Sequence, residues 1–251
     1  MSRINICNIP VDAYTMQETV GLIDKAIAEN RAIHHVVINA AKVVNAQKDE
    51  ALRESIVSCD IINADGQAIV WASRILNRPL PERVAGIDLM SNLVKLAHEK
   101  NYRIFFLGAK ENVVKDVVDY YSKTYSPDII AGYRNGYFKK EEEPDVARQI
   151  ADSNAKILFV AMSSPKKEIF LNTYKHLIQT PFIMGVGGSF DVVSGLVKRA
   201  PLWMQKWGLE WFYRVLQEPK RMWKRYLFGN SEFIWLVTKE KWNQTFKRNK
   251  K

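Results

Sequence analysis

Cysteine is scarce in this chain, and long apolar stretches are missing. The two cysteines, Cys7 and Cys59, are too few for the disulfide framework of a small secreted domain. No apolar run approaches the ~18–20 residues that a membrane-spanning helix needs. The N-terminal segment MSRINICNIPVDAYT lacks the charged start and apolar core of a secretory signal. We therefore expect a cytoplasmic protein without a membrane span.

Signatures of metal and nucleophile chemistry are missing as well. There is no Asp-x-Asp pair, and ligand-like spacing is absent among the four histidines, His34, His35, His98 and His176. Neither a serine elbow nor a cysteine–histidine pairing is visible. No full G-x-G-x-x-G follows the first strand, which weakens the alternative of a nucleotide-dependent oxidoreductase or epimerase. We expect no metal ion and no cofactor.

Positive charge is concentrated at one end of the chain. Between Lys198 and Lys251 there are 14 Lys and Arg against 4 Asp and Glu, and the first 197 residues carry 23 charges of each sign. Six of the seven tryptophans also follow residue 200. We predict a catalytic body over residues 1–197 and a basic, aromatic appendage over residues 198–251. A basic segment favours an anionic partner, whether substrate phosphate, lipid headgroup or nucleic acid.

Short apolar runs alternate with helical patterns along the body. The expected strands are His35–Asn39, Asp60–Asn63, Arg103–Leu107, Asp128–Ala131, Lys156–Val160 and Pro181–Val186. The expected helices are Ala41–Cys59, Gln67–Leu76, Asp88–Lys100, Val113–Thr124, Pro144–Ser153 and Lys166–Ile178. This alternation predicts an α/β fold, with a mostly parallel, Rossmann-like sheet flanked by helices.

The two ends of the chain add further elements. A strand over Ile4–Ile9 and a helix from about Met16 to Glu29 are expected at the N-terminus. In the appendage, apolar residues recur every four positions from Trp203 to Val215, which predicts an amphipathic helix with an aromatic face. Glu218-Pro219 should interrupt it. Arg221–Phe228 follows, then Gly229-Asn230, then Phe233–Trp242, which is again apolar with basic residues. Such a helix suits either the surface of an anionic membrane or packing against the body.

Polar residues follow several predicted strands, where ligands bind in open α/β sheets. Asn39 follows HVVI, and Asp65-Gly66 follows IINA. A carboxylate at a strand end can serve as a general base on a hydroxyl group. The position of Asp65 by itself favours another role, the N-terminal cap of the helix Gln67–Leu76, and one residue could do both.

Glycine-rich strand ends are candidates for binding a donor substrate. Gly108 suits a tight turn before a helix whose N-terminus could hold a phosphate, although an ordinary strand-to-helix turn is the better explanation of this glycine. Three glycines within Gly185–Gly188 let a backbone approach a ligand closely. The candidates here are Gly108, Ala109, Lys110, Gly185, Gly187 and Asp191.

Charged loop residues form a further group. Arg83 could bind a phosphate with its two-pronged guanidinium group, or form a surface salt bridge. Lys167 and Glu168 open a helix, where Glu168 would favour the helix dipole. Ser163 lies at the preceding strand end and could bond to a ligand. We group Ser163, Lys167 and Glu168 with donor binding, and Asp88 with the acceptor.

Taken together, several motifs resemble those of the WecG/TagA/CpsF glycosyltransferases. They occur in order along nearly the whole chain: ADG at Ala64–Gly66, PERVAGIDL at Pro81–Leu89, FFLGA at Phe105–Ala109, GYF at Gly136–Phe138, SPKKE at Ser164–Glu168, GVGGSFDVVSG at Gly185–Gly195, and KRAPLWMQKWGLEWFYRVLQEPKRMWKRY at Lys198–Tyr226. The last block is long and specific.

The resemblance implies an inverting, metal-independent transfer of a sugar from a UDP-sugar. The acceptor would be a polyprenyl-diphosphate-linked sugar on the inner membrane face. The transferred sugar would be of the N-acetylmannosamine, N-acetylmannosaminuronate or glucose class, and the product would enter wall teichoic acid, common antigen, capsule or exopolysaccharide. Dimers or trimers through the body are compatible with this family.

The resemblance also implies roles for single residues. Asp65 falls on the proposed general base, and Asn39 and Arg83 on positions that line the active site. Arg214, Arg221 and Arg225 match basic positions that would reach the diphosphate while the appendage packs at the membrane. One residue departs from the pattern, because Lys167 stands where the family often has glutamine.

A nucleic-acid-binding protein is the main alternative from another class. Basic residues interleaved with aromatic ones can bind single strands. The charge-balanced body argues against it, because a binding module of that kind does not need several ligand-like strand ends. We therefore expect a UDP-sugar, a lipid-linked acceptor and an anionic membrane surface as partners, and no nucleic acid.

Overall fold

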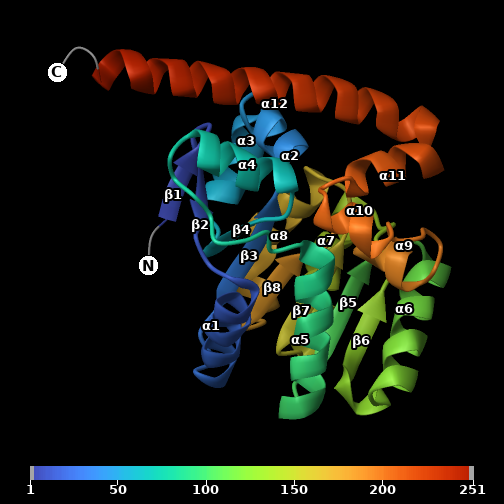
Figure 1. Cartoon of the computed structure of the whole chain (residues 1–251). Coiled ribbons are helices and arrows are strands. Elements are labelled where there is room, and N and C mark those ends of the chain that lie inside the picture. Colours follow the sequence, from blue (N-terminus) through green and yellow to red (C-terminus); the bar gives the residue numbers. More distant parts are fainter. Residues whose placement is uncertain (1–2, 249–251) are drawn as a thin grey trace.

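The computed structural model describes residues 3–248, apart from the side chains of residues 221–222, 224–226 and 247–248. At its centre lies a six-stranded parallel sheet with the order β4-β3-β8-β7-β5-β6 (Figure 1). The strands are β3 (Ile33–Ile38), β4 (Ile61–Ala64), β5 (Ile104–Gly108), β6 (Ile130–Arg134), β7 (Ile157–Ala161) and β8 (Phe182–Gly185). The predicted α/β fold is confirmed, and all six predicted body strands lie within a few residues of their expected places.

Helices cover both faces of this sheet. One face packs against α1 (Met16–Ala28), α5 (Gly86–Lys100), α6 (Glu111–Thr124) and α9 (Ser189–Val193). The other packs against α2 (Ala40–Ala46), α3 (Glu50–Val57), α4 (Gln67–Ile75), α7 (Glu143–Asp152) and α8 (Lys166–Ile178). Two short 3-10 turns, η1 (Pro127–Ile129) and η2 (Lys140–Glu142), flank β6 and α7.

Alternation along the central strands explains why the sheet is buried on both sides. In β5, Ile104 and Phe106 point into one apolar cluster while Phe105 and Leu107 point into the other. Successive side chains of a strand point to opposite faces, so a strand between two helix layers needs apolar residues at every position. All residues of β4, β5, β7 and β8 are accordingly buried.

Two predicted elements of the first half differ in the structure. The single strand expected at the N-terminus is a hairpin of β1 (Arg3–Ile6) and β2 (Ile9–Asp12). Cys7 and Asn8 form its turn with φ of 49° and 62°, the conformation that two-residue hairpins favour. The long helix expected after β3 is split into α2 and α3, because Asp49 caps a new helix by accepting a hydrogen bond from the backbone N–H of Leu52.

The appendage also divides differently from the prediction. The expected aromatic helix is two helices, α10 (Leu202–Lys206) and α11 (Glu210–Gln217), separated at Gly208, whose φ is +71°. The predicted interruption at Glu218-Pro219 is confirmed, because α11 ends at Gln217 and α12 (Pro219–Arg248) begins at Pro219. α12 then continues through Gly229-Asn230. A glycine inside a helix costs only about 1 kcal/mol, and packing against α2 offsets that cost here.

The long helix α12 is docked onto the body along part of its length. Figure 1 shows it crossing above α2 and α4, and Phe233 and Val237 are buried in the apolar cluster of those helices. Glu240 anchors it further by accepting hydrogen bonds from the backbone N–H of Cys7 at 2.7 Å and from Arg78 at 2.9 Å. No described helix between residues 3 and 248 combines the length and apolar character required to cross a bilayer.

Candidate active site

The carboxyl ends of β3 and β4 bring two predicted site residues together. Asn39 follows β3 and caps α2, accepting a hydrogen bond from the backbone N–H of Lys42 at 3.0 Å. Asp65 follows β4, and its backbone N–H donates to the carbonyl of Ile38 at 2.9 Å. A Cβ placed on Gly66 would lie 3.4 Å from the Cβ of Asn39. The glycine therefore lets the two strand ends lie against each other.

Asp65 does not cap the helix that follows it. The N-cap of α4 is Gly66, without a side-chain hydrogen bond, and the carboxylate of Asp65 instead accepts the backbone N–H of Gly86 at 3.1 Å. The capping interpretation is therefore wrong. Burial raises the pKa of Asp65, and the Gly86 N–H and Arg83 oppose this effect only in part. A carboxylate with a raised pKa at a strand end is suited to accept a proton.

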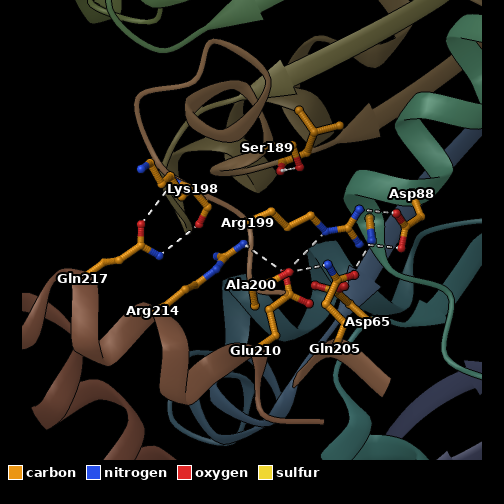
Figure 2. Close-up of polar contacts among 12 residues, drawn as sticks. Asp65, Asp88, Ser189, Lys198, Arg199, Ala200, Gln205, Glu210, Arg214 and Gln217 are labelled. Atoms are coloured by element: carbon orange, nitrogen blue, oxygen red, sulfur yellow. Dashed lines mark hydrogen bonds and ion pairs between the residues drawn. The ribbon is translucent and has the colours of Figure 1, made fainter. Parts of the chain in front are cut away.

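The appendage supplies charged residues to the surroundings of Asp65 (Figure 2). Arg83 pairs with Glu210, the first residue of α11, at 3.2 Å. Arg199 makes two hydrogen bonds to Asp88, at 2.6 and 2.8 Å. Arg214 of α11 lies 3.9 Å from Glu210. The salt bridge considered for Arg83 thus exists, but it joins the body to the appendage instead of lying at an open surface.

Lys167 and Glu168 belong to a second, buried group of charges. The Glu168 carboxylate lies 3.1 Å from Nζ of Lys42 and 3.4 Å from Nζ of Lys167. Both contacts are ion pairs between a carboxylate and an ammonium group, and both partners are largely buried. Burial alone would raise the pKa of Glu168, but the two lysines outweigh it and lower that pKa to about 2. Glu168 is thus paired with lysines, a role that goes beyond favouring a helix dipole.

The side chain of Lys167 packs directly against Gly185. A Cβ on Gly185 would lie 2.5 Å from Cε of Lys167, so the lysine side chain runs directly over the end of β8. Ser163 is exposed at the end of β7, and its carbonyl accepts the backbone N–H of Lys167 at 3.0 Å. These predicted donor residues therefore lie together at the ends of adjacent strands.

Gly108, Ala109 and Lys110 lie farther along the sheet. β5 is four strands from β4, which corresponds to roughly 19 Å at the usual strand spacing. Gly108 has φ of +126°, and a Cβ there would lie 2.4 Å from the carbonyl oxygen of Ala161. The glycine is thus required for β5 to lie against β7, in agreement with an ordinary turn.

Gly187 precedes α9 and Asp191 lies in its first turn, next to the appendage. Gly187 has φ of +54° and open space where a side chain would stand. Asp191 lines a cavity of about 40 Å³ together with Gly188, Val197, Arg214 and Gln217. The side chains of Arg221 and Arg225, assigned to the diphosphate from the sequence, lie outside the described residues.

Two residues of this region were not singled out from the sequence, Arg199 and Glu210. Both lie in the C-terminal motif block, in RAP and GLEW respectively, so the signal was present. Their importance emerges from their contacts, because each is paired with a residue more than a hundred positions away in the chain. Among the described residues, no three or more His, Cys, Asp or Glu gather as a metal-ligand group.

Comparison with known proteins identifies the family of the chain. Residues 4–247 match the description "Glycosyl transferase WecG/TagA/CpsF family". The chain is 38% identical over 248 residues to the N-acetylglucosaminyldiphosphoundecaprenol N-acetyl-beta-D-mannosaminyltransferase of Bacillus subtilis (strain 168), covering 98% of this chain and 95% of that protein. It is 34% identical to the enzyme of the same name from Staphylococcus aureus (strain MW2), covering 88% and 87%. The chain is therefore a glycosyltransferase and belongs to the WecG/TagA/CpsF family.

Proposed function

We propose that this enzyme transfers N-acetylmannosamine from UDP-N-acetylmannosamine to N-acetylglucosamine linked through a diphosphate to a polyprenyl lipid. The support is similarity to relatives whose names state an N-acetylmannosaminyl transfer to such a lipid-linked sugar, over 98% of this chain for the Bacillus subtilis protein. The product would feed a cell-surface polysaccharide. We propose that the donor is bound around β8 and α8, where Lys167 lies over Gly185.

Inversion at the sugar requires direct attack by an acceptor hydroxyl on the anomeric carbon. Asp65 would remove the proton from that hydroxyl, because its carboxylate has a raised pKa and is held by one backbone N–H. Asn39 beside it would help to orient the acceptor. The departing UDP carries negative charge, which Arg83 and Arg214 would stabilise with fixed positive charge. We propose that these arginines serve where other transferases use a metal ion.

We further propose that the appendage docks on the inner face of the membrane. Trp203 and Trp207 are 60% and 73% exposed, so most of the surface of each side chain faces solvent. Leu202 and Leu216 are exposed on the same helical pair, and basic residues flank them. Exposed tryptophan and leucine beside cations suit the interface of an anionic bilayer.

Liposome flotation with phosphatidylglycerol vesicles tests the docking. The double variant Trp203→Ser/Trp207→Ser should float less than the native chain. The matched double variant Tyr120→Ser/Tyr137→Ser, which removes exposed rings from the body, should float normally. Equal flotation of all three proteins would refute the docking surface.

A donor screen tests the activity. Purified full-length protein is offered UDP-N-acetylmannosamine, UDP-N-acetylglucosamine or UDP-glucose with a short polyprenyl-diphosphate-N-acetylglucosamine, and UDP release is measured. UDP release with the first donor alone, dependent on the acceptor, is expected. Acceptor-dependent release with another donor and none with UDP-N-acetylmannosamine would overturn the proposed sugar.

A further inference from the structure

Three arginines converge on the carboxylate of Glu210. Arg83 comes from the loop before α5. Arg199 comes from the segment before α10 and Arg214 from α11, and Figure 2 shows both beside Glu210. Only Arg83 is within hydrogen-bond distance, at 3.2 Å from Oε2. Nε of Arg199 and Nη2 of Arg214 both lie 3.9 Å from Oε1. One small anion thus stands inside a ring of cations from body and appendage.

The ring is wider than a carboxylate can bridge. A separation of 3.9 Å is too long for a hydrogen bond, so Oε1 lies between two guanidinium groups and bonds to neither. Nε of Arg199 is buried and has no hydrogen-bond partner among the side chains and backbone that the structure describes. Buried polar groups are almost always satisfied, so an unsatisfied guanidinium N–H here indicates a missing acceptor. A diphosphate offers more oxygens over a longer span and could bond to all three arginines.

The local charge gives the same indication. Among the described side chains, Arg83, Arg199 and Arg214 are offset by Glu210, Asp65 and Asp88, so three positive charges face three negative ones. Asp88 is already held by two hydrogen bonds from Arg199. A diphosphate added to this neutral set would meet repulsion from Glu210 in particular. The site accepts the anion only if Glu210 withdraws.

We propose that Glu210 is an internal placeholder for a substrate diphosphate, and that Arg199 is a further diphosphate-binding residue. Before substrate binds, Glu210 keeps the arginines convergent and close to Asp65. The diphosphate displaces it and takes over its partners, including Arg199. Because Glu210 begins α11, its release also frees the N-terminal end of that helix to adjust over the occupied site. The identity of the diphosphate as that of the nucleotide rests on the proposed function.

Titration calorimetry on the full chain tests this placeholder, with inorganic pyrophosphate, UDP and farnesyl diphosphate as separate probes. Glu210→Gln retains the size of the side chain and removes its charge, and it should tighten pyrophosphate binding by roughly tenfold, since a like charge is removed from the site. Glu232→Gln, the same change on α12, should leave binding unchanged. A stronger gain for UDP than for farnesyl diphosphate identifies the nucleotide as the source, and the reverse identifies the lipid.

Arg199→Lys provides the second arm. It retains the charge but loses the two-pronged geometry, so pyrophosphate binding should weaken while Glu210→Gln strengthens it. A residue with only a structural role would not produce a gain in affinity when replaced. If Glu210→Gln, with a melting temperature near that of the native chain, binds pyrophosphate no better or more weakly, the placeholder is refuted. Tighter pyrophosphate binding by Glu210→Gln would support the placeholder even if the native chain transfers no N-acetylmannosamine. The second result would refute the proposed function alone.

Discussion

Replacing Asp65 with asparagine should separate catalysis from folding. Among the described residues, only the backbone N–H of Gly86 donates a hydrogen bond to this carboxylate, and an asparagine oxygen can accept the same bond. What the variant loses is the ability to take a proton. General-base catalysis is worth roughly 10²-fold or more, so turnover should fall by about this factor. At 1.36 kcal/mol per decade, this loss corresponds to a rise of about 2.7 kcal/mol in the activation free energy.

The folding stability of this variant should change in the opposite sense. Burial raises the pKa of Asp65 above its ordinary value of 3.8, so the native state binds the proton more tightly than the unfolded chain. The free energy of unfolding therefore falls as pH rises from about 3.8 through the native pKa. At neutral pH the ionised carboxylate costs stability, and Asp65→Asn should melt at the same temperature as the native chain or higher. This advantage should vanish in acid.

UDP release and thermal melting from pH 4 to 8 measure both effects. The exposed Asp145→Asn serves as the matched control and should leave turnover unchanged. In the native enzyme, turnover should fall as pH drops through the raised pKa of Asp65, because the protonated base is inactive. Near-normal turnover by Asp65→Asn would remove this residue from the role of base. A large loss of melting temperature at pH 7 would show that its charge stabilises the fold and would refute the reasoning.

Three further changes test the packing and the buried charges. Gly108→Ala should prevent native folding or cost several kcal/mol in urea unfolding, since its Cβ would meet a β7 carbonyl oxygen at 2.4 Å, whereas Gly21→Ala in open helical space should be neutral or stabilising. Phe233→Ala should cost about 3–5 kcal/mol and loosen α12, whereas Ile234→Ala, at a 64% exposed position, should cost little; equal losses would contradict the docked helix. Glu168 should contribute on the order of 3 kcal/mol at neutral pH, lost as pH falls from 4.5 to about 2, so Glu168→Gln should flatten acid unfolding curves over that window.

The local sequence pattern was enough to predict most of the sheet. It failed where contacts between two distant segments decide the structure. The strands β5 and β7 are continuous apolar runs, and their burial on both faces follows from that composition alone. The continuity of α12 through Gly229 could not be read this way, because a contact with α2 decides it. The split between α2 and α3 had a local signal in Asp49, which an unbroken apolar pattern concealed.

The candidate site divides in a similar way. Asp65, Asn39 and Gly185 could be proposed because each follows a strand, and parallel strands end at one edge. The position of Asp65 favoured a role as cap of the following helix. This prediction is wrong, because its carboxylate accepts a hydrogen bond from Gly86 on another helix. The sequence could not assign a role to Arg199 or Glu210, because the role of a single charged residue depends on the residues it contacts in the folded chain.

By itself, the sequence determined an α/β body, a basic aromatic appendage and the family to which the chain belongs. These are properties of composition, period and motif order, which need no knowledge of distant contacts. Only the tertiary structure decided that the appendage returns to the body, with Phe233 buried against α2 and Glu210 beside Arg83. Charges separated by more than a hundred residues interact only after the chain has folded, because their Coulomb energy depends on distance in space and on burial.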